Sequence, residues 1–279
     1  MVGASGQVGR HLWQELQADG AGVAGTYASR PETGLHRLDI TDGDAVRALI
    51  FKLVPEVVWL PAALPDVDRC EREPELSRRI NLDGPRHIGE ACRQAGARLV
   101  FFSTDYVFDG VGGPFLETDA VRPLQVYGTH KAMAEENLLR EVPESLIIRP
   151  AWVYSRESNP RNFVWRILQQ VESGGVLKAA ADQISTPTPA GALARMAIAA
   201  ATRGQRGILH LAGPERLTRY ALTCRIARLA GYPETSIVGV ATSSLHLPAA
   251  RPLDGGLVTA QRAFRIGEKL TDVSLHGGS

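Results

Sequence analysis

The chain has 279 residues, of which 44% are hydrophobic and 22% charged, and its formal net charge is +1. This length is enough for one large domain, or two closely merged domains, with a buried core. No run of eighteen apolar residues is present, no signal-peptide pattern opens the sequence, and the lysines and arginines are spread along the chain. We therefore expect a soluble, cytoplasmic protein that binds neither membranes nor nucleic acid.

The three cysteines, Cys70, Cys92 and Cys224, are far apart in the sequence. None belongs to a CxxC pair or has a histidine at a metal-ligand spacing. We expect them to be reduced thiols and predict no metal site.

The first 150 residues alternate short, β-branched apolar runs with amphipathic segments. This alternation is typical of repeated βαβ units in a mostly parallel α/β sheet. Apolar spacing predicts helices near residues 8–16 and 45–53, and Thr41 with Asp44 resembles a capping box for the second. The expected strands are 21–27, 35–39, 57–60, 99–103 and 146–149.

After Pro150 the pattern loosens and proline and glycine become frequent. We predict helices over 162–171, 190–202 and 219–230 and a strand over 208–211. The simplest division is a nucleotide-binding domain over residues 1–150 and a smaller cap over 151–279, with part of the second segment returning to the first domain.

A glycine-rich turn opens the chain, where Gly3, Gly6 and Gly9 precede an amphipathic helix. Such spacing lets the backbone approach a pyrophosphate at the positive end of a helix. With the strands that follow, it predicts a Rossmann-type doubly wound sheet that binds a dinucleotide. Only Met1 and Val2 are left for the strand before the turn, so either the start is trimmed or the sheet uses a stub. The predicted cofactor contacts of the turn are Gly3, Ser5, Gly6, Gln7, Val8 and Gly9.

The segment after the second strand indicates which dinucleotide binds. NAD sites place a carboxylate there, but this chain has Tyr27, Ser29 and Arg30, which could hold a 2′-phosphate. We expect NADPH, with a solvated Arg30 as the alternative. Asp39 and Ile40 are placed to contact the adenine, although Asp39 could equally be a turn residue. The small residues Pro61, Ala62 and Ala63 after the next strand would let the cofactor lie close to the backbone.

Tyr127 and Lys131 form a YxxxK pattern at the start of a helical stretch. A four-residue step puts both on one helix face, where the ammonium can stabilise a phenolate. A phenol that exchanges protons near neutral pH needs its pKa lowered by about three units, roughly 4 kcal/mol. We expect Lys131 and an oxidised nicotinamide to provide this stabilisation.

Thr104 lies just beyond the strand over 99–103, where parallel sheets bind ligands. Its hydroxyl can donate to a ketone oxygen, and we prefer it to Ser103. The predicted roles are a proton from Tyr127, activation by Lys131 and polarisation by Thr104, with hydride from the nicotinamide.

Together these motifs resemble the extended short-chain dehydrogenases, and more narrowly the dTDP-4-dehydrorhamnose reductase group, which also contains the regulatory β subunit of methionine adenosyltransferase. The matching segments, in chain order over nearly the whole sequence, are GASGQVG, VDRCEREPE, INLDG, STDYVFDG, YGTHKAMAEE, IIRPAWVYS, the Asn162-Phe163 pair, Asp182-Gln183 with Thr186-Pro187-Thr188, and Ala250-Arg251-Pro252.

The resemblance implies NADPH-dependent reduction of a nucleotide-linked 4-keto-6-deoxysugar by Thr104, Tyr127 and Lys131. It implies that Tyr127, Lys131 and Pro150 also contact the cofactor, and that the cap holds the nucleotide sugar. Asn81 matches an asparagine that supports the catalytic lysine, with a structural role as the alternative. The implied substrate contacts are Thr104, Asp105, Tyr106, Trp152 and Arg251, the last for the diphosphate, with core packing for Trp152 and an ion pair for Arg251 as alternatives.

Other functions within this superfamily stay open. Sugar-nucleotide dehydratases carry Asp-Glu after the threonine, whereas Tyr106 follows Asp105 here, which favours reduction over elimination. A non-catalytic, NADP-binding regulatory subunit is the second hypothesis, and the intact Thr104, Tyr127 and Lys131 disfavour it. An epimerase that retains NAD is the third. Some relatives dimerise, so a homodimer is an open expectation.

Overall fold

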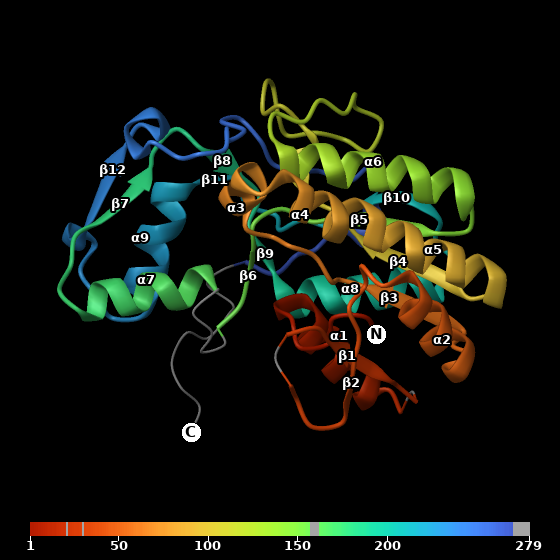
Figure 1. Ribbon diagram of the computed structural model, residues 1–279. Helices are drawn as coiled ribbons and strands as arrows, with labels where there is room; N and C mark the ends of the chain where they lie inside the picture. Colours follow the sequence, from red (N-terminus) through yellow and green to blue (C-terminus); the bar gives the residue numbers. More distant parts are fainter. Residues whose placement is uncertain (21, 30, 157–161, 270–279) are drawn as a thin grey trace.

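A twisted sheet between two helical layers and a smaller cap beside it make up the protein (Figure 1). The computed structural model describes residues 1–20, 22–29, 31–156 and 162–269. Four strands of the sheet are parallel and adjacent in the order β10 (Gly207–His210), β5 (Leu146–Arg149), β4 (Arg98–Phe102) and β3 (Val57–Leu60). A further parallel pair is formed by β1 (Gly25–Tyr27) and β2 (Leu35–Arg37).

The first residues of the chain join these two groups of strands. The Val2 amide donates to the Trp59 carbonyl at 2.8 Å, on β3. On the other side, the Thr26 amide donates to the Met1 carbonyl at 2.9 Å. The short N-terminal segment therefore lies between β1 and β3 and links the two groups of strands by backbone hydrogen bonds, although it does not form a regular strand. The second strand ends at Arg37, two residues earlier than expected.

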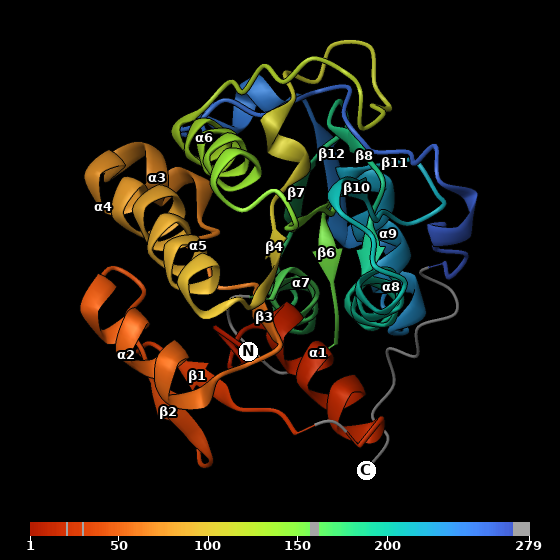
Figure 2. The same ribbon diagram turned by 90° about the vertical axis from the view of Figure 1, so that its right-hand side faces the viewer.

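Side chains of the central strands alternate between the two faces of the sheet, and both faces are buried. On β4, Leu99 and Phe101 pack in one core cluster while Val100 and Phe102 pack in the other. The first cluster lies under α2 (Gly43–Leu53), α5 (Gly84–Ala95) and α6 (Val126–Glu141), and the second under α1 (Gln7–Ala18) and α8 (Ala190–Thr202) (Figure 2). This arrangement confirms the predicted doubly wound α/β fold.

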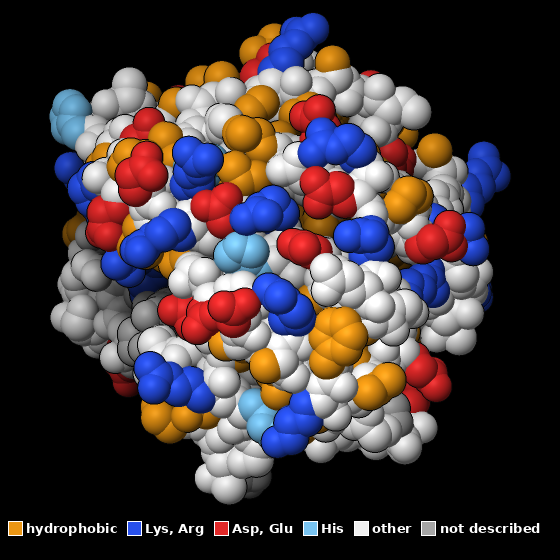
Figure 3. All heavy atoms as spheres, turned by 45° about the vertical axis from the view of Figure 1, so that its right-hand side comes forward, with side chains coloured by type: hydrophobic (Ala, Val, Ile, Leu, Met, Phe, Trp, Pro, Cys, Tyr) orange, Lys and Arg blue, Asp and Glu red, His pale blue; other side chains and the backbone are white. Residues whose placement is uncertain are grey.

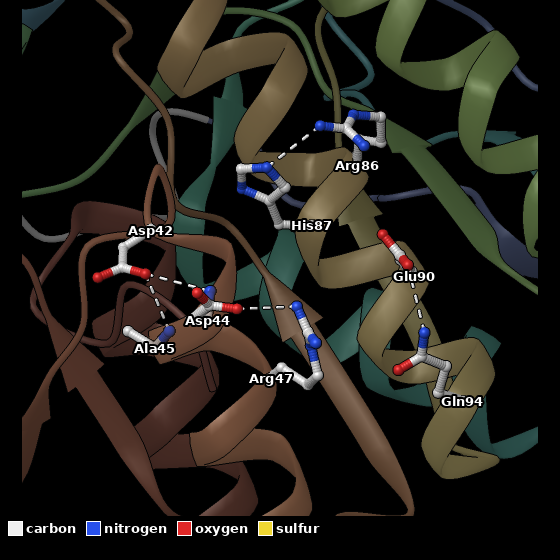
Figure 4. A network of polar contacts seen from close by, with 8 residues as sticks. All are labelled: Asp42, Asp44, Ala45, Arg47, Arg86, His87, Glu90 and Gln94. Carbon is white, nitrogen blue, oxygen red and sulfur yellow. Dashed lines mark hydrogen bonds and ion pairs between the residues drawn. The ribbon is translucent and has the colours of Figure 1, made fainter.

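The start of α2 differs from the predicted capping box. The side chain of Asp42, not Thr41, accepts hydrogen bonds from the amides of Asp44 and Ala45, at 3.1 and 3.0 Å (Figure 4). Asp44 instead pairs with Arg47 at 2.9 Å. Asp42 is the better cap because its short carboxylate reaches both amides from the residue just before the helix.

The sequence patterns predict no separate elements for the helical segment between β3 and β4. It consists of α3 (Val67–Arg72), α4 (Pro74–Arg78), a π-helical turn η1 (Arg79–Asp83) and α5. The π turn places Asn81 toward the interior, with 1% of its surface exposed. The short 3-10 turns elsewhere are η2 (Asp105–Val107), η3 (Glu234–Ser236), η4 (Thr242–Leu245) and η5 (Arg262–Phe264).

The cap contains α7 (Phe163–Glu172), α9 (Arg219–Leu229) and small two-stranded sheets. Parallel pairs form between β7 (Leu177–Ala180) and β12 (Ile237–Val240), and between β6 (Val153–Tyr154) and β9 (Thr188–Pro189); β8 (Ile184–Ser185) and β11 (Leu217–Thr218) pair antiparallel. Between its two cap segments the chain returns to the first domain. There β10 pairs with β5 in the sheet, and α8 packs on one face of that sheet. The division at residue 150 stays a prediction.

The surface is mixed in charge. On the face shown in Figure 3, acidic and basic side chains alternate and neither sign forms a broad patch. Within the described ranges, every helix is too short or too polar to cross a membrane. Cys70, Cys92 and Cys224 are buried free thiols, and the described residues contain no group of three metal-ligating side chains.

Candidate active site

The glycine turn is packed so closely that side chains would block it. Gly3 has φ +90°, and a Cβ there would lie 2.9 Å from the side chain of Ala62. A Cβ on Gly9 would lie 2.1 Å from the Gly3 carbonyl oxygen. Gly6 caps α1 without any side-chain hydrogen bond from the described residues. The close-packed turn at the start of α1 is suited to a diphosphate, which the positive end of the helix would stabilise.

The segment after β1 is contacted by a cation of α1 that sequence reasoning missed. Arg10 pairs with Glu32 at 2.9 Å and also reaches the Ser5 carbonyl at 3.3 Å. Ser29 is exposed, and the predicted phosphate contact Arg30 lies outside the described residues. The Glu32 contact brings Arg10 to the segment that follows β1.

The two residues predicted beside the adenine have other contacts. An Asp39 carboxylate oxygen accepts from the Thr41 amide at 2.9 Å, which is the turn geometry weighed as the alternative. Ile40 is 6% exposed and packs in the core under α5, where a Cβ on Gly84 would touch it. Their contact with a cofactor stays a prediction.

The loop after β4 holds the predicted hydroxyl. The side chain of Thr104 accepts from the Tyr106 amide at 3.2 Å and so starts the turn η2. The Asp105 amide donates to the carbonyl of Pro150 at 3.0 Å, at the end of β5. Ser103 is also buried, but its hydroxyl has no hydrogen-bond partner among the described residues. The loop is thus fixed to two strand ends with the Thr104 side chain at its start.

Tyr127 and Lys131 lie on the buried face of α6, with 8% and 1% of their surfaces exposed. The Lys131 ammonium donates to the carbonyl of Phe102, the last residue of β4, at 2.6 Å and lies 3.9 Å from the centre of the Phe101 ring. The side chain of Gln125 caps the helix by accepting from the Gly128 amide at 3.1 Å. Helix and strand therefore bring the predicted trio to one end of β4.

Burial dominates the protonation of this group. It raises the pKa of Tyr127; the buried Cys70 adds to the rise and a hydrogen bond from Thr104 opposes it. Burial also lowers the pKa of Lys131 to about 7, while Glu135 raises it. The predicted lowering of the phenol pKa is therefore not seen in the protein alone, because desolvation disfavours the phenolate more than nearby groups favour it. Tyr127 holds its proton.

Asp105 is a fully buried carboxyl. Burial raises its pKa to about 6, and hydrogen bonding to Ser185 and the charge of Arg219 lower it. The Ser185 hydroxyl, on cap strand β8, donates to Asp105 at 3.0 Å. The carboxyl thus connects the catalytic loop to the cap.

Tyr106 and Trp152 each contact a different partner. Tyr106 packs edge-on against Tyr127 with 6.3 Å between ring centres. Trp152 has φ +36°, a left-handed conformation that is costly for a bulky residue. The guanidinium of Arg219 stacks on its ring, 3.5 Å from the centre. Arg219 was missed because nothing in its local sequence indicates that it reaches Trp152.

Two other predicted residues have structural partners. Arg251 pairs with Asp68 at 2.8 Å, which is the ion pair weighed as its alternative. Asn81 binds the backbone of Leu64 in both directions, accepting from the amide at 2.9 Å and donating to the carbonyl at 3.1 Å. Asn81 therefore fixes the loop that follows β3.

The fold and the buried Thr-Tyr-Lys group define a nucleotide-binding protein of the extended short-chain dehydrogenase type. Residues 1–274 match the family model described as RmlD substrate binding domain, and the chain belongs to this family. A dTDP-4-dehydrorhamnose reductase of Streptomyces griseus is 37% identical over 90% of this chain and 82% of its own length.

Solved structures agree with this assignment. A dTDP-4-dehydrorhamnose reductase of Clostridium acetobutylicum superposes with a TM-score of 0.84 and 31% identity, covering 94% of this chain and 89% of its own. The Bacillus anthracis enzyme, solved in complex with NADP, gives a TM-score of 0.84 and 26% identity over 92% and 88%.

Proposed function

We propose that this chain is a cytoplasmic reductase that transfers hydride from NADPH to the keto group of a nucleotide-linked 4-keto-6-deoxysugar. The observation that carries the proposal is the burial of Tyr127 and Lys131 on one face of α6 at the end of β4, where Lys131 binds the Phe102 carbonyl and Thr104 begins the next turn. The names of the relatives support the substrate class, and the Bacillus anthracis complex supports the cofactor.

Bound NADPH would supply the hydride, and the glycine turn with Ala62 would hold its diphosphate. The protein's own groups supply the proton. A reduction needs a donor that is protonated at the start, and the raised pKa of Tyr127 meets this need. As charge develops on the substrate oxygen, Tyr127 would release its proton and Thr104 would donate a hydrogen bond.

Lys131 would stabilise the phenolate that remains. Its pKa near 7 means that the ammonium is only partly charged in the protein alone, and a phenolate nearby would favour the charged form. The Phe102 carbonyl holds the nitrogen in place at 2.6 Å. The roles of Thr104, Tyr127 and Lys131 are thus those expected for a ketone reductase.

The test is NADPH oxidation with dTDP-4-keto-6-deoxysugar, comparing the wild-type protein with Tyr127→Phe. Loss of the proton donor should lower kcat by about 10²- to 10⁴-fold while the NADPH Kd stays nearly unchanged. Full activity in the variant would refute the catalytic assignment. Tight NADPH binding by the wild-type protein without turnover of any nucleotide keto sugar would instead favour the regulatory-subunit hypothesis.

A further inference from the structure

Arg219 is presented to the catalytic loop by the cap. It is the first residue of α9, and its amide donates to the Gln183 carbonyl at 2.8 Å. The preceding strand β11 pairs with β8, which carries Ser185, the hydrogen-bond partner of Asp105. The small β8–β11 sheet therefore fixes the start of α9 beside Asp105 and Tyr106, and both of these groups act on the pKa of Arg219.

The guanidinium of Arg219 contacts two aromatic rings. It lies 3.5 Å from the centre of the Trp152 ring and 4.5 Å from that of Phe163. Stacking on two aromatic rings orients the plane of a guanidinium but leaves its N–H edges free. Within the described part of the chain, the guanidinium makes no hydrogen bond and no ion pair.

The charge of Arg219 has no directly bonded anion within the described residues. Burial is the largest cause that lowers its pKa to about 10; the nearby Tyr106 and Asp105 raise the pKa, and repulsion from Arg166 and Arg251 lowers it. Arg251 has its own partner in Asp68, and the Asp105 carboxyl is already bound to Ser185. A partly buried cation with no anion bonded to its N–H groups is costly even with a carboxylate nearby, so the surroundings of Arg219 favour binding of a further anion.

We propose that Arg219 binds the diphosphate of the nucleotide-linked substrate, through its free N–H edges and while stacked on Trp152. This inference rests on the substrate class proposed above. A planar guanidinium matches two phosphate oxygens at once. Because Arg219 and Asp105 are joined through the β8–β11 sheet, a diphosphate held there would also position the sugar against Thr104 and Tyr127. Arg219 is thus a specificity and positioning residue.

The test is calorimetric titration of the NADP-loaded protein with dTDP and with thymidine. Removal of the charge in Arg219→Met should weaken dTDP binding by about 10- to 100-fold and leave thymidine binding unchanged. Arg219→Lys should fall between, because it keeps the charge without the planar fork. The matched control is Arg228→Met on the same helix, where an exposed arginine pairs with Glu234; it should bind dTDP like the wild-type protein.

Several results would overturn the inference. If Arg219→Met weakens the binding of dTDP and of thymidine equally, Arg219 only supports the fold of the site. If the dTDP affinity is unchanged, Arg219 binds no phosphate. An equal loss of NADP affinity would assign it to the cofactor instead. Each of these results contradicts a substrate-diphosphate role.

The inference and the proposed function can fail separately. If the wild-type protein does not turn over the dTDP-linked keto sugar, the same titrations with UDP and GDP test Arg219 independently. Arg219-dependent binding of any of these nucleoside diphosphates would keep the inference while the reductase proposal fails. If turnover occurs but no nucleoside diphosphate depends on Arg219, the reductase proposal stands and the inference is wrong.

Discussion

Ser185 of the cap donates a 3.0 Å hydrogen bond to Asp105, the buried carboxyl next to Thr104. The pKa of Asp105 is raised by burial from 3.8 to about 6, so its ionisation opposes folding. A raised pKa gives a stability contribution that is complete below pH 3.8 and is lost as pH rises through 6.

Asp105→Asn removes this ionisation and keeps an acceptor for Ser185. The free energy of unfolding of the variant, relative to wild type, should therefore increase between pH 4 and pH 8 by up to about 3 kcal/mol. Urea unfolding at several pH values measures it. If the difference in unfolding free energy between the variant and the wild-type protein does not change with pH in this range, burial does not raise the pKa of Asp105.

Ser185→Ala should raise the pKa of Asp105 further, because the serine hydrogen bond favours the carboxylate. In this background the stability gain of Asp105→Asn should begin at the same pH, which the unfolded chain sets, but level off at a higher pH and reach a larger value. An unchanged upper end and size of the gain in the Ser185→Ala background would mean that the Ser185 hydroxyl does not act on the carboxyl.

The left-handed backbone of Trp152 gives a second prediction. Glycine normally destabilises relative to alanine, but at φ +36° the Cβ of alanine is strained and glycine is not. Trp152→Gly should therefore be more stable to urea than Trp152→Ala by about 1 kcal/mol. Both lose the indole equally, so the alanine variant serves as the control. A more stable alanine variant would contradict the strain.

A buried ion pair supports the helix that carries Tyr127 and Lys131. Arg149 on β5 contacts Glu135 on α6 through several hydrogen bonds, and both side chains are at most 3% exposed. Arg149→Met should cost about 3 to 5 kcal/mol of unfolding free energy, because it leaves a buried carboxylate unpaired. Adding Glu135→Leu should restore much of this loss. If Arg149→Met alone were as stable as the wild-type protein, Glu135 would have found another partner.

The glycine turn predicts a binding defect. Gly9→Ala places a methyl group where the Gly3 carbonyl lies, so the turn must open, and we expect the Kd for NADPH to rise at least about tenfold. Gly22→Ala is the control, since a Cβ there meets no atom within 4 Å. Fluorescence titration with NADPH compares them. Equal affinity of the two variants would mean that the turn does not hold the diphosphate.

Local sequence patterns were sufficient to place Tyr127 and Lys131 together on one buried helix face, while the roles of the site residues stay predictions. Two glycines before a helix with a third in its first turn, and a four-residue step from Tyr127 to Lys131, are local patterns, and the sheet follows from alternating apolar runs. The stacking of Arg219 on Trp152 and the ion pair of Arg251 with Asp68 join distant segments. Only the tertiary fold brings these segments together. The sequence therefore could not distinguish an arginine that is free to bind the diphosphate from one that is already in an ion pair.

The cap is built from two segments of the chain, one before α8 and one after β10. Two of its small sheets pair strands of the first segment with strands of the second. Leu177 on β7 pairs with Ile237 on β12, and Ser185 on β8 with Leu217 on β11, across the segment that builds α8 and β10. Such long-range pairs close large loops, which makes them slow to form. We therefore expect the cap to fold last, after β10 has joined β5. During synthesis the glycine turn would therefore form before Ser185 of the cap can bind Asp105.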